Sequence, residues 1–172
     1  MKSVLMSIKP EWCAKIASEH KTIEIRKTKP SLPTPFKVYI YCTEPNTTDP
    51  HKYLETHSDD GYIYKCNGNV FAEFVCEEIK ELAPINRAGD DLEEKACMNR
   101  EEIVRYLKGK GYAWYISDLV IYNKPKELNE FKQCHKCPYG YEECTRHEYS
   151  CNGAYNVQNP PQSWCYVNEV QK

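Results

Sequence analysis

Alternating apolar and polar residues predict most of the regular structure in this chain. Within residues 21–27, Ile23 and Ile25 fall on one face of an extended segment, and Glu24 and Arg26 fall on the other. The same alternation, with many β-branched and aromatic residues, predicts a set of strands. These are 4–8, 21–27, 36–42, 69–79, 113–125 (as one or two strands stopped by Pro125) and 163–170.

Two segments have the apolar spacing of helices. Residues 10–18 start with Pro10, which is favoured at the first position of a helix. Residues 99–111 start with Asn99, and Glu102 follows three positions later as in a capping box. This second helix is expected to end at one of two glycines, Gly109 or Gly111.

Several strands with two or three short helices predict an α+β fold. A length of 172 residues favours a single domain that spans residues 1–172. Residues 43–61 are polar and rich in Pro, Asn, Thr and Asp, so we expect a loop there. The pattern is typical of a small mixed β-barrel or a related α+β sheet.

Charge and hydropathy narrow the classes of partner. The chain has 23 Lys+Arg against 25 Asp+Glu, a formal net charge of -2, so no global basic field would draw it onto nucleic acid. Any such contact must come from a local patch. No apolar run approaches the roughly 20 residues of a membrane span, and the first residues do not read as a signal peptide. We expect a cytoplasmic protein with reduced cysteines and no membrane partner.

Residues 131–153 contain a cluster of cysteines with the spacing C-x2-C-x6-C-x6-C. A close pair of thiolates followed by two later ligands is typical of a structural zinc site. Reduced thiols in a loop and an iron–sulfur cluster are the alternatives. The predicted Zn²⁺ ligands are Cys134, Cys137, Cys144 and Cys151, with His147 as a substitute.

The charged strand at 21–27 has two interpretations. It is either a solvated face with ordinary ion pairs or part of a ligand site. A nucleotide site needs cations, a hydrogen-bond acceptor and an aromatic plane, although a lone Trp is more often a core residue. The candidates for ligand contact are Lys9, Trp12, Lys21, Thr22, Glu24, Arg26, Trp114, Ser117 and Trp164.

The segment "LMSIKPEWCAKIASEHKTIEIRK" resembles the start of the ASCH domain, a branch of the PUA-like β-barrels. The family's lysine and glutamate match Lys21 and Glu24, and its frequent arginine matches Arg26. Glu19 or His20 stands where the family has a glycine. The chain looks most like small ASCH-type proteins of Firmicutes bacteria and their phages, many of which carry a cysteine-rich insert before the last strand.

The resemblance implies a PUA-like barrel with a zinc-binding insert at 131–153, and a cleft that binds RNA or a nucleotide. Some members are hydrolases that act on acetylated cytidine or on RNA, and Lys21 and Glu24 would then be catalytic. The deacetylating group has a threonine where this chain has Glu24, with Thr22 nearby, and a distant glutamate that would match Glu73 or Glu77. Binding of RNA or a nucleotide-like molecule is the main hypothesis. An amidohydrolase or ribonuclease, and a phage factor that contacts a host protein or sequesters a nucleotide, are the alternatives.

Overall fold

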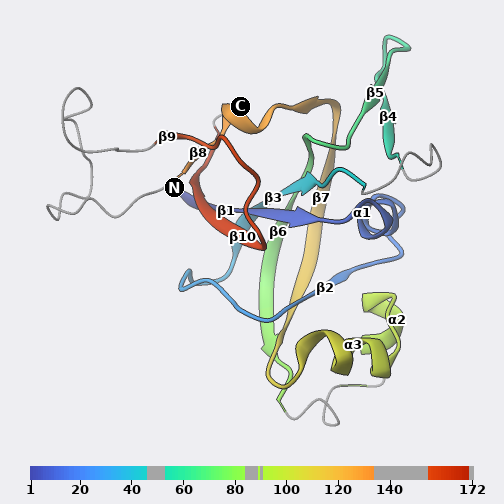
Figure 1. The fold of residues 1–172 in the computed structure, drawn as a ribbon, viewed down its shortest axis with the longest axis vertical. Helices are drawn as coiled ribbons and strands as arrows, with labels where there is room; N and C mark the ends of the chain where they lie inside the picture. The colour runs from blue at the N-terminus through green and yellow to red at the C-terminus, as the bar shows by residue number, and fades with distance from the viewer. Residues whose placement is uncertain (46–52, 84–88, 90, 134–154, 171–172) are drawn as a thin grey trace, which may run out of the picture.

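The computed structural model describes residues 1–45, 53–83, 89, 91–133 and 155–170. In the described part, ten strands and three α-helices form a mixed α+β fold (Figure 1). The strands are β1 (Lys2–Ile8), β2 (Ile23–Arg26), β3 (Phe36–Cys42), β4 (Glu55–His57), β5 (Ile63–Lys65), β6 (Val70–Glu81), β7 (Tyr112–Lys126), β8 (Lys132–Gln133), β9 (Tyr155–Asn156) and β10 (Trp164–Asn168). The helices are α1 (Pro10–Ala17), α2 (Leu92–Ala96) and α3 (Arg100–Leu107). A 3₁₀ turn covers Leu128–Glu130. No described helix combines the length and the hydropathy that crossing a membrane requires.

Eight strands form one sheet in the order β2-β7-β6-β3-β1-β10-β8-β9. β1 and β3 are parallel, and the other pairs of this sheet are antiparallel. β4 and β5 form a separate hairpin. β6 and β7 are long strands that run through the centre of the molecule, with α2 and α3 near one end and the hairpin near the other (Figure 1).

The predicted α+β class is confirmed, but the predicted closed barrel is not seen among the described pairings, because β2 and β9 remain edge strands. The chain entering β2 makes its backbone hydrogen bonds to helices and not to a closing strand. Lys21 N donates to Lys15 O on α1, and Thr22 N donates to Lys95 O on α2, both at 2.9 Å. The side chain of Arg26 on β2 donates instead to the backbone oxygen of Ser7 on β1, at 2.8 Å.

The two faces of β2 meet different partners. Ile23 and Ile25 pack with α2 and α3 in a small apolar cluster that includes Leu92 and Ile103. The opposite face carries Glu24 and Arg26, and all four residues of β2 are buried. Alternation with period two therefore separates an apolar face from a buried polar one, as the sequence predicts.

The predicted capping box of α3 is confirmed, with Asn99 and Glu102 bonded reciprocally at 2.9 Å. The helix ends at Leu107, earlier than either glycine, because Lys108 itself adopts the left-handed conformation with φ 54. Helix α2 and the hairpin β4–β5 were not predicted, and both are short. β7 is one strand that continues past Pro125, because its pairing with β6 is irregular there and does not require a proline N–H.

Candidate functional site

The carboxylate of Glu24 lies between two cations on the buried polar face of β2. Glu24 Oε1 is 3.0 Å from Arg26 Nε, and Glu24 Oε2 is 3.3 Å from Lys21 Nζ. The N–H of Arg26 Nε is not aligned as a hydrogen bond, so this contact is an ion pair. The three residues that were predicted to form the centre of the site are therefore linked, because Glu24 contacts both Lys21 and Arg26.

All three N–H donors of the Lys21 ammonium have an acceptor. Nζ donates to the carbonyl oxygens of Ile23 and Ala96, both at 2.8 Å, and pairs with Glu24. Only 1% of Lys21 is exposed. The lysine holds Glu24 and joins β2 to α2, and it has no donor left for a ligand.

Lys21 reaches the polar face because it precedes the regular part of β2. Glu19 adopts the left-handed conformation, with φ 59, in the turn between α1 and β2. Glu19 is therefore the residue of this turn whose backbone conformation favours glycine. The turn is therefore tight although neither Glu19 nor His20 is a glycine, and Lys21, Glu24 and Arg26 still come together.

Arg26 connects β2 to the junction of β1 and β10. Its Nη2 donates to Ser7 O at 2.8 Å, and its Nη1 makes a longer contact of 3.4 Å with Ser163 Oγ. Ser7 and Ser163 are joined by a backbone hydrogen bond of 3.0 Å. Ser7 could not be predicted from the sequence, since a backbone carbonyl leaves no signature there.

Burial rules out the interpretation of this strand as a solvated charged face. Glu24 and Arg26 are each 6% exposed, so water screens their charges far less than it screens a surface pair. Two cations and one anion leave a formal excess of one positive charge in a buried place. Burying such a network costs free energy. Its excess positive charge favours the binding of an anion beside Arg26.

α1 contributes an aromatic side chain and a thiol near the network. The Trp12 ring is half-buried and lies under Lys21 Nζ at 5.2 Å and under Lys15 Nζ at 4.6 Å from its centroid. Burial raises the pKa of Cys13 well above its usual value, and neighbouring Cys42 and Glu24 act in the same direction. Cys13 is therefore a neutral core thiol and a poor nucleophile.

The remaining predicted ligand residues are divided between the surface and the core. Lys9 is exposed before α1, and half-buried Trp164 donates from Nε1 to Thr28 Oγ1 at 3.0 Å. Trp114 is completely buried and packs edge-on against Phe36, so it offers no exposed plane for stacking. Its Nε1 has no hydrogen-bond partner within the described residues.

Thr22 and Ser117 both form hydrogen bonds with backbone groups of neighbouring strands. Thr22 is half-buried, and its carbonyl accepts from Ile116 N at 2.9 Å. Ser117 Oγ donates to Val75 O at 3.1 Å across the β6–β7 pair. Both are placed by strand pairing, and Thr22 lies beside the network because it immediately follows Lys21.

The two glutamates considered as a distant catalytic partner lie elsewhere on the sheet. Glu73 forms a separate polar cluster, in which it accepts from Tyr122 Oη at 2.6 Å and pairs with Lys37 at 3.2 Å. Burial, reinforced by the hydrogen bond to Glu73, raises the pKa of Tyr122 far above its ordinary value. Glu77 is exposed. Glu73 thus interacts with Lys37 and Tyr122 on another part of the sheet, away from Glu24.

The predicted zinc ligands lie outside the described residues. Among the residues that are described, no group of three or more His, Cys, Asp or Glu side chains is arranged to hold a metal ion. The zinc site therefore stays a prediction for Cys134, Cys137, Cys144 and Cys151, with His147 as a substitute.

No protein-family model and no curated protein matches this sequence. Solved structures do match. An ASCH protein from Zymomonas mobilis has 18% identity and a TM-score of 0.60, over 97% of this chain and 88% of that one. A tyrosine-to-phenylalanine mutant of the same protein has 19% identity and a TM-score of 0.60, over 98% and 92%. The predicted resemblance to ASCH proteins is thus confirmed for the fold.

Proposed function

We propose that this chain binds RNA, or a nucleotide-like anion, beside the buried network of Lys21, Glu24 and Arg26. The observation that carries the proposal is that Glu24 fixes Arg26 in a buried place with one excess positive charge. Arg26 Nη1 makes only a long contact with Ser163 Oγ, which a phosphate oxygen could replace. Guanidinium groups bind phosphate strongly because their donors form a planar fork.

Exposed lysines around the network support this assignment. Elsewhere on the surface many lysines pair with carboxylates, such as Lys65 with Glu44 at 3.1 Å. Four exposed lysines near the network form no ion pair with any acid of the described chain, and three of them lie over aromatic rings. These lysines are Lys9, Lys15, Lys27 and Lys29.

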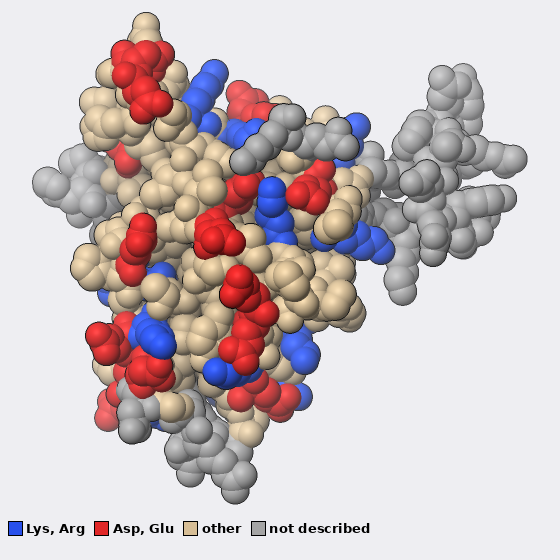
Figure 2. All heavy atoms as spheres, turned by 180° about the vertical axis from the view of Figure 1, so that it is seen from behind, with Lys and Arg blue, Asp and Glu red and all other residues tan. Residues whose placement is uncertain are grey.

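The basic surface is local. Figure 2 shows that acidic and basic side chains are interspersed on the face seen from behind the view of Figure 1. This mixture agrees with the balanced net charge and disfavours general coating of nucleic acid. Binding is therefore expected at one face, near α1 and β2.

The geometry favours binding over hydrolysis. A general base needs a free lone pair near the reacting proton, and Lys21 is a saturated hydrogen-bond donor with 1% exposure. Glu24 is held by two cations, so it is placed to orient Arg26. A hydrolase acting on a modified nucleoside or on RNA is the weaker candidate, because neither Lys21 nor Glu24 is free to act as a base.

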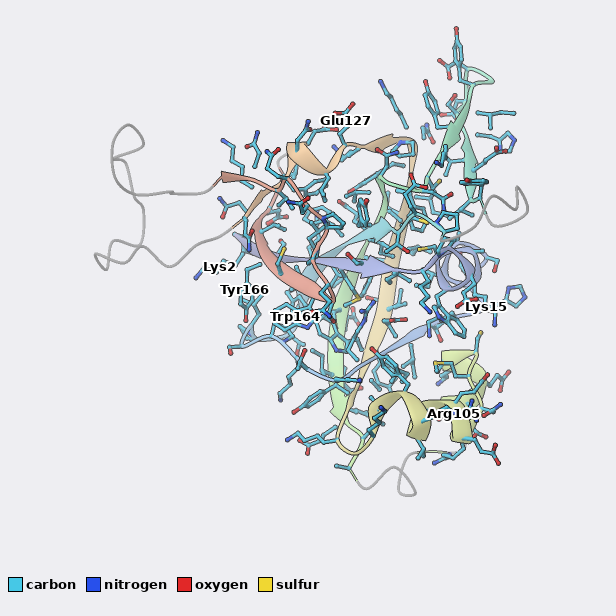
Figure 3. All side chains as sticks on the ribbon, in the orientation of Figure 1. Lys2, Lys15, Arg105, Glu127, Trp164 and Tyr166 are labelled. Carbon is cyan, nitrogen blue, oxygen red and sulfur yellow. The ribbon has the colours of Figure 1, made fainter. Side chains whose placement is uncertain are left out.

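The test is fluorescence anisotropy with a labelled single-stranded RNA of eight nucleotides, at several salt concentrations. We expect binding that weakens with salt, and an Arg26→Lys variant that binds about tenfold more weakly, the value of one charge-assisted hydrogen bond. The matched control is Arg105→Lys on exposed α3 (Figure 3). No binding by the wild-type protein, or equal binding by Arg26→Lys, would contradict the proposal. Cleavage of the RNA, or deacetylation of acetylated cytidine, that is lost in Lys21→Ala would favour the hydrolase.

A further inference from the structure

The segment directly after β2 forms a second basic surface that continues from the buried network. Lys27 follows Arg26 in the chain, and a shallow depression is lined by this segment and by β7. The lining residues are Lys27, Thr28, Lys29, Pro30, Ser31, Leu32, Pro33 and Tyr112. Tyr112 pairs with Arg26 in the β2–β7 register, so the depression begins where the network ends.

Cations in and beside this depression lie over aromatic rings. Lys29 Nζ is 5.4 Å and Lys110 Nζ is 5.5 Å from the centroid of Tyr112, and Lys27 Nζ is 5.2 Å from that of Tyr106. Lys110 also pairs with Glu81 at 3.2 Å, whereas Lys27 and Lys29 pair with no acid among the described residues. The two uncommitted charges are thus held by rings that contribute no compensating anion.

The segment is fastened to β10 by side-chain hydrogen bonds. Trp164 Nε1 donates to Thr28 Oγ1 at 3.0 Å, and Ser31 N donates to Tyr166 Oη at 2.7 Å. The rings of Trp164 and Tyr166 meet edge to face, with centroids 5.4 Å apart. Figure 3 shows these two side chains beneath β10, on the side of the segment that joins β2 to β3. Trp164 and Tyr166 are half-buried, so part of each residue stays exposed where the segment with the lysines is attached.

From this arrangement we infer that the ligand is a single-stranded polynucleotide and not a mononucleotide. The segment 27–33 would form its second phosphate subsite, and this inference rests on the proposed function. Unpaired cations such as Lys27 and Lys29 beside partly exposed aromatic residues are a combination that binds single strands, since phosphates need charge and unstacked bases need a ring. A mononucleotide would occupy the Arg26 end alone. A rigid duplex would not present bases to Trp164 and Tyr166.

The experiment compares four labelled probes by anisotropy: UMP, oligouridylates of two and eight nucleotides, and the octamer in a duplex. The variants are Lys27→Ala/Lys29→Ala and, as a control, Lys124→Ala/Lys126→Ala at the far end of β7. The subsite predicts that the octamer binds the wild type more tightly than UMP and more tightly than the duplex. In the Lys27/Lys29 variant, the octamer should bind like the dinucleotide. The salt slope of log K should fall by about 1.4, or roughly 0.7 for each lost phosphate contact.

The control variant should keep the wild-type length dependence and salt slope. If the wild type binds RNA but the Lys27/Lys29 variant keeps its slope and its preference for the octamer, the subsite is wrong and the proposed function stands. Equal affinity for UMP and octamer would also overturn the subsite alone. If the wild type binds none of the four probes, the proposed function itself fails.

Discussion

Arg26 on β2 donates a 2.8 Å hydrogen bond to the backbone oxygen of Ser7 on β1, and so connects two strands that do not pair with each other. In the order of the sheet, β2 is an edge strand, and three strands separate it from β1. A side chain thus makes the connection that strand pairing would make in a closed barrel. Because the carbonyl of Ser7 is buried at this point, the guanidinium has a structural role in addition to the ligand contact that we propose for it.

Replacing Arg26 by lysine tests this connection. A lysine keeps the charge but has a single nitrogen, so it cannot reach both Glu24 and Ser7 O. The carbonyl of Ser7 would lose the hydrogen bond from Arg26, and we expect the free energy of unfolding to fall by about 1–3 kcal/mol. Urea denaturation measures this loss. Arg105→Lys on the exposed face of α3 should change stability by less than about 0.5 kcal/mol.

Removing the anion at the centre of the network should have a larger effect. Glu24→Gln leaves Lys21 and Arg26 buried together without a counter-charge, and such a change costs about 3–5 kcal/mol of unfolding free energy. The control is Glu44→Gln, whose pair with Lys65 is about half exposed and should be worth less than about 1 kcal/mol. Denaturant curves that coincide for the two variants would show that the network contributes no more than a surface pair.

The alternation of 21–27 predicted which side chains share a face, and the structure confirms Glu24 and Arg26 on one side. It could not predict their burial, since charged residues are mostly exposed and only long-range packing covers them. Alternation alone does not place Lys21 on this face, because its position depends on the turn at Glu19. Its acceptor at Ala96 lies on α2, a five-residue helix with too few residues to show a periodic pattern.

Outside the site, strong local signals were the reliable ones. The strand at 36–42 agrees with β3, and Asn99 caps α3 as the sequence indicates. Trp114 is a candidate from the sequence because a tryptophan can either pack in the core or contact a ligand. Its burial against Phe36 follows from which strands pair, and no local pattern contains that information.

The backbone at Glu19 leads to a prediction of higher stability. A residue other than glycine in the left-handed region costs about 1–2 kcal/mol, and glycine loses roughly 0.5–1 kcal/mol more in conformational entropy on folding. Glu19→Gly should therefore stabilise the protein by about 0.5–1 kcal/mol, which corresponds to a rise in Tm of about 1–4 °C. Glu11→Gly within α1 should instead destabilise it by about 1 kcal/mol. A lower Tm for Glu19→Gly would mean that the side chain of Glu19 has an interaction that outweighs the backbone cost.

The cysteines of 134–151 lead to a prediction about metal content. Four thiolates, or three with His147, would bind one Zn²⁺ per chain in a closed site. Native mass spectrometry of the purified protein should show this stoichiometry, and Cys134→Ser/Cys137→Ser should abolish it. Cys97→Ser, outside the cluster, is the control and should retain the metal. A wild-type protein that is well folded without metal would exclude a structural zinc site.

Buried thiols predict how stability depends on alkaline pH. Burial raises the pKa of Cys76 to about 12, and that of Cys66 to about 11, from ordinary values near 9. A group whose pKa is higher in the folded state stabilises that state fully below pH 9. Its contribution is then lost as the pH rises towards 12, because only the unfolded chain releases the proton easily. For Cys76 this amounts to roughly 1 kcal/mol between pH 8 and pH 10. Cys76→Ala should have a lower unfolding free energy at pH 8, since a buried side chain is shortened, but a shallower decline between pH 8 and pH 10. Urea denaturation at the two pH values, with reductant present, gives both quantities. Parallel declines in the variant and the wild type would show that the Cys76 thiol has the same pKa in both states.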